Sequence, residues 1–577
     1  MTVGLQKNAP VWQPREVDDD SVRKLTAGLG VSETLAKILV GRGIRDEGLA
    51  ERFLSPRLAD LPDPARLAGM HAAVERIVHA LRHDECIGIF GDYDVDGVTS
   101  TTLLWEFLES IGGRVVATLP DRLKEGYGLS RAGVDRLRDA GSTLLVTVDC
   151  GVTAHEEVAY CTQQGVDVIV IDHHTVPVTL PDAVAVINPH RPDCESAAEH
   201  LCAVGVTYNL CLALRRELRN QGYFSTLRPE PDLRKNLDLV ALGTVADVVP
   251  LVEDNRIFVH YGLRNIRSRL RLGMDALLEV AGVPMHRIGA STLGFQLGPR
   301  VNAAGRLGDA MKAVELLRSA KTEHARELAN ALDRENTSRR DLERRMTQEA
   351  FDEVDASQFH QESRVLVIGR EDWHPGVVGI VASRVVERYG KPTVIVGEGG
   401  RGSGRSIPAY HLYDGLHFVS ETLEGFGGHA HAAGVRVRAG GLEKFREALA
   451  GHAGLHLAEN DLRRVWTHDG DLPVEAIDEG LCQELSRAAP YGRKNPEPLF
   501  RIPKVHPRGV RPLSGGHFKA NVHPNGNVEA ILFGAGERMG EFQGEVSLLG
   551  TPEINEWRGR KTVQLRLRDF QSGEQAS

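Results

Sequence analysis

Short apolar runs alternate with longer amphipathic segments between residue 86 and about residue 190. Runs such as ECIGIF, TLLVTVD and DVIVID contain β-branched residues and have the length of buried strands. Segments with helical periodicity, such as TSTTLLWEFLESIGG, lie between them. Such alternation is typical of βαβ units. The pattern therefore predicts an α/β fold whose main domain is a doubly wound, mostly parallel sheet.

The pattern changes along the rest of the 577 residues, which are too many for one core. Proline is absent between Pro299 and Pro375, and the charged, helix-forming sequence there predicts a connecting helix. A second group of apolar runs begins at SRVLVIG, and short strands with Gly and Pro turns, typical of a small β-barrel, follow from about residue 463. The predicted parts are a helical N-terminal extension (1–80), a first α/β domain (81–309), the connecting helix (310–355), a second α/β domain (356–460) and an OB-like β-barrel (461–577).

The formal net charge is −10. This balance alone disfavours a polyanionic partner, because affinity for nucleic acid comes largely from neutralised phosphates. The bases are unevenly distributed, however, and between Arg487 and Lys519 the chain has eight lysines and arginines and a single acid, Glu497. These bases predict a local positive surface on the barrel, as an oligonucleotide-binding fold requires.

No apolar run is long enough to span a membrane, and the polar N-terminus lacks the apolar core of a signal peptide. We therefore expect a cytoplasmic protein without a membrane partner. The seven cysteines are scattered without a CxxC pair, which argues against a zinc ribbon or a disulfide framework.

Potential metal ligands follow three of the apolar runs, in the sequences GDYDVDG, VTVDCG and IDHHT. They are Asp92, Asp94 and Asp96, then Asp149, then Asp172, His173 and His174. Because the carboxyl ends of parallel strands meet at one edge of a sheet, we expect these side chains to converge. Like charges gathered there would repel one another unless cations held them. Asp247, after the apolar stretch LDLVALGTVA, is a fourth candidate, although a helix cap is an equally good interpretation.

The aspartates of GDYDVDG are spaced as in an EF-hand calcium loop, but the twelfth position is Leu103 instead of glutamate. Carboxylates combined with imidazoles suit manganese or magnesium, whereas a structural zinc site would show thiolates. The number of ligands favours two ions bridged by a carboxylate, as in sites of phosphoryl hydrolysis. No GxSxG, Cys-His or P-loop signature is present, so acyl transfer and NTP hydrolysis lack support.

Together, GDYDVDG, VTVDCG, DHH and GTVADVVPL resemble the four signature motifs of the DHH phosphoesterase superfamily. Four further motifs, LGPRVNAAGR, DWHPGVVGIVASR, GSGRS and GGHAHAAG, resemble those of its RecJ branch, the single-strand-specific 5′ to 3′ DNA exonucleases. The resemblance implies that the first α/β domain is a DHH domain and the second a DHHA1 domain. Departures are mild: Val95 stands where alanine is common, and Cys150 where asparagine is common.

The resemblance also implies roles for individual residues. The expected ligands of two Mn²⁺ or Mg²⁺ ions are Asp94, Asp96, Asp149, His173, His174 and Asp247, with Asp92 joining or adjoining them and Asp172 orienting a histidine, all eight serving catalysis. The expected substrate contacts are Arg122, Arg300, Asn302, Arg306, Ser403, Arg405, Gly427, Gly428 and His429. On the barrel, Lys504, Arg508 and Arg511 would guide the strand.

The function implied is hydrolysis of single-stranded DNA from its 5′ end to 5′-mononucleotides, in repair and recombination. The DNA strand would pass between the DHH and DHHA1 domains of the enzyme. The implied protein partners are single-strand-binding protein and a helicase, and the implied state is a monomer. Two alternatives stay open. A DHH phosphodiesterase of short oligonucleotides or cyclic dinucleotides would not need the basic barrel, and a non-catalytic DNA-binding scaffold would not need the full set of acids and histidines.

Overall fold

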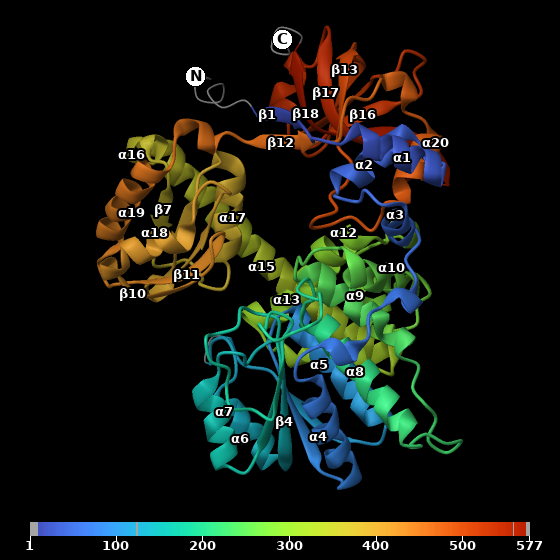
Figure 1. Ribbon diagram of the computed structural model, residues 1–577. Coiled ribbons are helices and arrows are strands. Elements are labelled where there is room, and N and C mark those ends of the chain that lie inside the picture. Colours follow the sequence, from blue (N-terminus) through green and yellow to red (C-terminus); the bar gives the residue numbers. More distant parts are fainter. Residues whose placement is uncertain (1–9, 123–124, 558, 573–577) are drawn as a thin grey trace. The chain divides into compact units, whose positions relative to one another are not determined.

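The computed structural model describes residues 10–122, 125–557 and 559–572 (Figure 1). It divides into two compact units. The larger unit comprises residues 12–299, 310–326 and 467–577, and the smaller comprises residues up to 11, 300–309 and 327–466. None of the described helices combines the length and the apolar character that crossing a membrane requires.

The N-terminal part is helical after one short strand. Its elements are β1 (Val11–Pro14), α1 (Asp19–Leu29), α2 (Glu33–Gly41), α3 (Glu47–Leu54) and α4 (Met70–Arg82). Asp18, Ser32 and Asp46 cap the first three helices, because each side chain accepts a hydrogen bond from the amide three residues later. The border predicted at residue 80 falls inside α4, and residues 1–9 of the predicted extension lie outside the described residues.

The parallel sheet predicted for the first domain is present in the larger unit. Its strands are β2 (Cys86–Gly91), β3 (Arg114–Thr118), β4 (Ser142–Val148), β5 (Asp167–Ile171) and β6 (Ala185–Ile187). They lie in the order β3-β2-β4-β5-β6, and every neighbouring pair is parallel. The connecting helices are α5 (Val95–Ser110), α6 (Arg131–Asp139) and α7 (His155–Gln163). Figure 1 shows α6 and α7 on one side of β4 and α4 on the other, which is the doubly wound arrangement.

Helices dominate the segment from residue 203 to residue 318. They are α8 (Ala203–Asn220), α9 (Leu237–Ala246), α10 (Glu253–Arg267), α11 (Leu272–Val280), α12 (Ala290–Thr292), α13 (Gly298–Leu307) and α14 (Met311–Arg318). Within this segment α8 and α9 pack on α5. The segment thus covers the helix that begins at the GDYDVDG motif.

The single connecting helix predicted for residues 310–355 is corrected by the structure. Two helices occupy this stretch, because α14 ends at Arg318 and α15 (Thr322–Ala356) begins after a break. Ser319 has an extended backbone, and its hydroxyl accepts a hydrogen bond from the Lys321 amide. A serine that bonds to nearby backbone competes with the helix in this way.

The smaller unit contains a mixed five-stranded sheet in the order β10-β11-β9-β8-β7. Its strands are β7 (Leu366–Gly369), β8 (Thr393–Val396), β9 (Arg401–Arg405), β10 (Leu423–Gly428) and β11 (Ala432–Val437), and its helices are α16 (Gln358–Glu362), α17 (Val378–Tyr389), α18 (Leu412–Phe418) and α19 (Leu442–His456). Only β7 and β8 are parallel. Val381 of α17 packs in one core with Ile368 and Ile395, and Phe445 of α19 packs in another with Val367 and Val394. Strands β7 and β8 are therefore covered on both faces.

The C-terminal part of the larger unit is a six-stranded sheet in the order β13-β17-β18-β16-β15-β14. The elements from residue 465 on are β12 (Val465–His468), which pairs with β1, α20 (Glu479–Ser486), β13 (Phe500–Val505), β14 (Arg508–Leu513), β15 (His517–Asn521), β16 (Glu529–Leu532), β17 (Val546–Trp557) and β18 (Arg560–Ser572). All neighbours in the six-stranded sheet are antiparallel except β16 and β18. Its core contains Phe518, Phe542 and Phe570. This is the β-rich domain that the pattern of short strands predicts.

Candidate metal centre

Three acidic residues directly follow three neighbouring strands of the parallel sheet. Their amides donate to the next strand along, Asp92 to the Val148 carbonyl (N···O 3.2 Å), Asp149 to that of Ile171 (2.9 Å) and Asp172 to that of Ile187 (3.0 Å). Each acid therefore extends the hydrogen-bond ladder by one residue. Asp149 then leaves the ladder with a φ of 63°, which is uncommon outside glycine. The three carboxylates lie at the same edge of the sheet, as the sequence pattern predicts.

The first turn of α5 supplies two more acids. Asp94 caps the helix by accepting from the amides of Asp96 (2.8 Å) and Gly97 (3.1 Å). Asp96 is buried, and its two oxygens accept from the amides of Ala203 (2.6 Å) and Val204 (2.9 Å), where α8 begins. The positive end of α8 thus faces a buried carboxylate.

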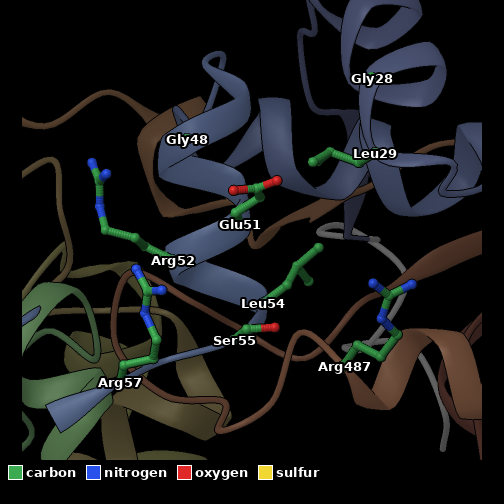
Figure 2. Close-up of a pocket in the computed structure, with 9 residues that line it drawn as sticks. All are labelled: Gly28, Leu29, Gly48, Glu51, Arg52, Leu54, Ser55, Arg57 and Arg487. Atoms are coloured by element: carbon green, nitrogen blue, oxygen red, sulfur yellow. The ribbon is translucent and has the colours of Figure 1, made fainter. Parts of the chain in front are cut away.

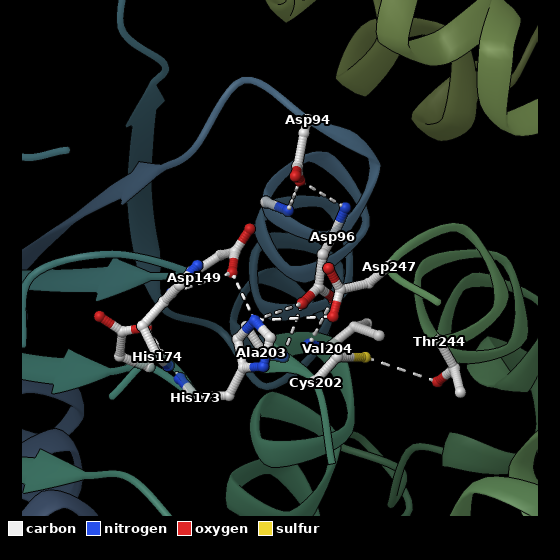
Figure 3. A network of polar contacts seen from close by, with 12 residues as sticks. Asp94, Asp96, Asp149, His173, His174, Cys202, Ala203, Val204, Thr244 and Asp247 are labelled. Carbon is white, nitrogen blue, oxygen red and sulfur yellow. Dashed lines mark hydrogen bonds and ion pairs between the residues drawn. The ribbon is translucent and has the colours of Figure 1, made fainter. Parts of the chain in front are cut away.

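His173 lies among carboxylates from three elements. Its Nε2 is 3.3 Å from Asp149 Oδ1 and 3.7 Å from the Oδ2 atoms of both Asp96 and Asp247 (Figure 3). Asp247 is the C-cap residue that directly follows α9. The structure therefore brings Asp247 into the same cluster as the acids that follow the strands.

Asp172 is engaged differently from its neighbours. Its Oδ1 is 2.7 Å from Nδ1 of His174 and also accepts from the amides of His173 and His174, while Oδ2 accepts from the Val152 amide. With both oxygens used, this carboxylate holds the His174 ring in a fixed orientation. The geometry agrees with the orienting role expected for Asp172.

Donor atoms gather in three groups, each with all its donor atoms within 4.8 Å of one another. The groups are Asp92, Asp94 and Asp149, then Asp149, His173 and His174, then Asp96, Cys202 and Asp247. Asp149 belongs to two of them. Oδ1 of Asp92 and Oδ1 of Asp149 are buried without a hydrogen-bond partner among the described residues. Buried carboxylate oxygens without partners, beside imidazole nitrogens, fit a hard divalent cation such as Mn²⁺ or Mg²⁺.

Burial and mutual repulsion shift the pKa values of these acids upward. Burial, with the charge of Asp94 next, raises the pKa of Asp96 to about 7, and burial with the charges of Asp96 and Asp94 raises the pKa of Asp247 to about 9. The pKa values of Asp92 and Asp149 are raised for the same reasons. The protein without ions therefore holds protons that ions would displace.

The pKa values of the two histidines shift in opposite directions. Burial, and then the charge of His174, lowers the pKa of His173 to about 4, so its ring is neutral at pH 7 and able to bind a metal. Burial alone would lower the pKa of His174, but the hydrogen bond to Asp172 and the surrounding negative charges raise it to about 9.

Sequence reasoning missed two side chains at this centre. Sγ of Cys202 joins Asp96 and Asp247 in one donor group and lies 3.6 Å from Oγ1 of Thr244. The hydroxyl of Tyr127 is 3.3 Å from the Asp149 carbonyl oxygen and 3.3 Å from each ring nitrogen of His174. Neither residue follows a predicted strand, so no local pattern marks it.

The predicted substrate residues of the first domain lie in different surroundings. The Arg122 guanidinium is 5.0 Å from the centre of the Tyr93 ring, next to the GDYDVDG motif. On α13, Arg300 Nε donates to Asp333 Oδ1 (2.9 Å), Arg306 Nη1 donates to the Gly376 carbonyl (2.8 Å), and Asn302 is half-buried. These three residues belong to the smaller unit.

The smaller unit places the remaining predicted phosphate contacts on one sheet. Ser403 of β9 pairs with Gly434 of β11, which pairs with Gly427 of β10, so the three lie in a row. Arg405 Nη1 donates to Ser403 Oγ (2.9 Å), and Gly428, with a φ of 139°, precedes His429, whose amide donates to Ala432 (2.8 Å). Glycines in such a row leave the strand surface open to an anion.

The three predicted barrel residues are not equivalent. Lys504 and Arg508 are exposed near the β13–β14 turn, and within the described part of the chain neither has a carboxylate at ion-pair distance. Arg511 instead pairs with Glu529 (2.6 Å), which also pairs with Lys519 (2.8 Å). Part of the predicted basic surface is thus neutralised within the protein.

Family models match three segments of the chain. They describe the DHH family N-terminal domain over residues 86–244, the DHHA1 domain over residues 362–452 and the RecJ OB domain over residues 468–569. The OB match agrees with the fold class expected for the C-terminal sheet.

The single-stranded-DNA-specific exonuclease RecJ of Bacillus subtilis (strain 168) is 36% identical over 568 residues, which cover 97% of this chain and 70% of the relative. The protein of the same name from Dickeya dadantii is 39% identical over 553 residues, covering 92% of this chain and 94% of the relative. The crystal structure of RecJ in complex with Mn²⁺ from Thermus thermophilus is similar with a TM-score of 0.83 and 30% identity, over 97% of this chain and 79% of that one. On this evidence the chain belongs to the RecJ family.

Proposed function

We propose that the chain is a metal-dependent exonuclease specific for single-stranded DNA, which cleaves from the 5′ end and releases 5′-mononucleotides. The observation that carries the proposal is the gathering of Asp92, Asp149 and His173 in two donor groups that share Asp149. Oδ2 of Asp247 lies 3.7 Å from Nε2 of the same His173. Such a site suits phosphodiester hydrolysis with two ions about 3.5 to 4 Å apart. RecJ relatives that are 36% and 39% identical are named single-stranded-DNA-specific exonucleases, which supports an exonuclease activity on single strands here.

The residues of the centre have distinct tasks in this proposal. Asp94, Asp96, Asp149, His173, His174 and Asp247 would hold Mn²⁺ or Mg²⁺, and Asp92 would join or adjoin them. Bound ions would supply Lewis acidity at the scissile phosphate and a more acidic attacking water. Asp172 fixes the His174 ring, and the amides of Ala203 and Val204 fix the Asp96 carboxylate, so the ligands are oriented before substrate arrives.

The polarity of cleavage would come from the smaller unit. Hydroxyl, guanidinium and backbone donors lie on β9 (Ser403, Arg405) and at the end of β10 (Gly427, Gly428, His429), with β11 between them. This set suits the phosphates of a DNA strand. We propose that Arg300, Ser403 and Arg405 bind the 5′-phosphate. Arg122, Asn302 and Arg306 would contact the strand nearby, and Lys504, Arg508 and Arg511 would guide it.

Digestion of single strands labelled at one end tests the proposal directly. With Mn²⁺ or Mg²⁺, the 5′ label should appear first, in mononucleotides, while duplex of the same sequence stays intact. The Asp149→Asn variant should leave both strands uncut. Early release of the 3′ label, or full activity of that variant, would overturn the proposal.

Two alternatives predict other outcomes. A phosphodiesterase of short oligonucleotides or cyclic dinucleotides would prefer those substrates to long strands, and a binding scaffold would bind the strand without cutting it. The exposed Lys504 and Arg508 favour a long polyanion. Single-strand-binding protein and a helicase as partners, the monomeric state and the cytoplasmic location stay predictions, which co-purification, sedimentation and fractionation would test.

A further inference from the structure

The loop between α20 and β13 lies beside the metal centre, although it belongs to the C-terminal part of the chain. The carbonyl of Arg493 accepts from the Leu251 amide (2.9 Å), and Arg493 Nη1 donates to the Val248 carbonyl (3.4 Å). Val248 directly follows Asp247. The loop tip is therefore fixed against the segment that carries one of the expected ligands.

The tip itself is a tight turn. The amide of Gly492 donates to the Asn495 carbonyl (2.8 Å), and the amide of Asn495 donates back to Gly492 (3.1 Å). The Asn495 side chain is buried and donates from Nδ2 to the carbonyls of Ala488 and Pro490, both at 2.9 Å. Arg493 and Lys494 stand at the centre of this turn, and both are exposed.

A buried arginine, Arg256, holds the loop in place through hydrogen bonds to its backbone. Arg256 is 2% exposed, and its guanidinium donates to the carbonyls of Phe53 (2.7 Å), Ala488 (3.1 Å) and Ala489 (2.8 Å). Burial lowers the pKa of this guanidinium to about 9. The guanidinium also lies 3.6 Å from the centre of the Phe53 ring. Burying a cation is costly even with these contacts, so the arrangement indicates that the position of the loop is important for function.

Backbone strain is concentrated at the same place. Val248, Glu253 and Lys494 have φ values of 59°, 46° and 61°, a region that favours glycine. Backbone strain of this kind tends to persist where it serves a function. Lys494 therefore presents a charged side chain at a position where glycine would be easier to accommodate.

The two positive charges of the turn are not neutralised by acidic side chains in the described part of the chain. Among the described residues, no carboxylate lies at ion-pair distance from Arg493 or Lys494. The Arg493 side chain lies next to the metal centre, because Nη1 donates to the carbonyl of Val248, the residue after Asp247. The exposed, positively charged side chains of Arg493 and Lys494, beside the metal centre, are suited to binding a phosphate group.

We infer that the Arg493–Lys494 turn binds a backbone phosphate of the DNA strand at the metal centre, so that the C-terminal domain supplies part of the active site. This inference rests on the proposed exonuclease function. The Arg493 guanidinium would make the directional contact, Lys494 would add charge, and Arg256 and Asn495 would act as positioning residues.

Two variants and a matched control test the inference. Arg493→Ala removes the directional contact, and Lys494→Gly removes a charge while it relieves the left-handed backbone. Arg52→Ala removes the same charge from helix α3, where Arg52 is exposed and lines a separate pocket with Glu51, Leu54 and Ser55 (Figure 2). Affinity for a fluorescent oligothymidylate in EDTA at several salt concentrations, kcat/KM with Mn²⁺, thermal unfolding and Mn²⁺ binding by electron paramagnetic resonance are measured for each.

Arg493→Ala should lower kcat/KM about tenfold and reduce the slope of log affinity against log salt by about 0.7, the value for one phosphate contact on a single strand. Lys494→Gly should weaken DNA binding without lowering the melting temperature, which a merely structural lysine would not do. Mn²⁺ binding should be unchanged or tighter in both variants, and Arg52→Ala should match the wild type.

Wild-type affinity and salt slope in both loop variants would overturn the inference. A wild-type protein that binds the strand but does not cut it would instead overturn the proposed function. The EDTA binding measurements would still decide the role of the turn in that case, so the two failures are distinguishable.

Discussion

Charges of the same sign gather both at the metal centre and on the basic surface of the C-terminal sheet, but they are buried at the centre and exposed or paired on the sheet. At the centre, Asp92, Asp96 and Asp149 are buried, and burial and repulsion raise their pKa values. On the sheet, Arg511 and Lys519 share Glu529, while Lys504 and Arg508 stay exposed in water. A buried cluster needs ions to be stable when charged, whereas an exposed one is screened and partly paired. Changes at the centre should therefore have large effects and changes on the surface small ones.

The largest effect is expected from Asp149→Asn, because this carboxylate belongs to two donor groups. Loss of several kcal/mol of transition-state stabilisation should lower kcat by at least about a thousandfold. Asp254→Asn is a matched control, since Asp254 is also buried and burial raises its pKa to about 7, but it belongs to none of the donor groups. Single-turnover rates that fell equally in both variants would show that burial, and not the ligand set, decides the effect.

The next largest effect is expected from a change in pH, which should alter the free energy of unfolding of the protein without ions. Asp247 and His174 keep protons in the folded protein up to about pH 9, whereas their ordinary pKa values are 3.8 and 6.5. Between pH 7 and 9 the folded state thus binds more protons than the unfolded state, and the free energy of unfolding should fall as the pH rises. The expected slope is about 1.4 kcal/mol per pH unit for each extra proton.

Melting temperatures in EDTA across this pH range check the slope, and Asp247→Asn should make it shallower by removing one proton. Added Mn²⁺ should stabilise the protein more at pH 9 than at pH 7, because the ion displaces those protons. A melting temperature in EDTA that rose from pH 7 to pH 9 would contradict the pKa shifts.

The contrast also explains what the sequence can predict. Asp92, Asp149 and Asp172 are visible because each directly follows an apolar run, and strand order places such residues at one edge. Asp247 follows a helix, so its place in the cluster depends on how α9 packs on α5, which no local pattern encodes. Cys202 and the Arg493–Lys494 turn come from segments distant in the chain, and only the folded structure places them near Asp247.

Some local features also cannot be predicted from the pattern of apolar and polar residues. The break at Ser319 interrupts a stretch whose composition favours helix throughout, because one side chain bonds to nearby backbone. Gly97 appears in the sequence as part of an acidic loop, but its role is steric, since a Cβ there would lie 2.3 Å from the Asp92 carbonyl oxygen. The pairing of Arg511 with Glu529 joins β14 and β16, which lie on either side of β15 and which the sequence does not align.

A moderate effect is expected from Arg405→Lys on the sheet of the smaller unit. Lysine keeps the charge but loses the planar fork that can bind a terminal phosphate in two places. The preference for a 5′-phosphate over a 5′-hydroxyl should fall about tenfold, which corresponds to the loss of about 1.4 kcal/mol. Competition between the two substrates measures this preference. Arg436→Lys, on the exposed side of the same sheet and paired with Glu424, is the control and should keep it.

The smallest effect separates paired from free bases on the C-terminal sheet. Glu529→Gln should release Arg511 and Lys519 from their shared carboxylate and strengthen strand binding about threefold, because surface ion pairs are worth only about 0.2–1 kcal/mol. The salt dependence should also steepen, by about 0.7 in slope for each new phosphate contact. Glu545→Gln removes the same charge from an exposed acid without freeing a base, so it should change binding less. Equal gains in the two variants would mean that net charge alone attracts the strand, and that the pairing of Arg511 has no bearing on its role as a guide.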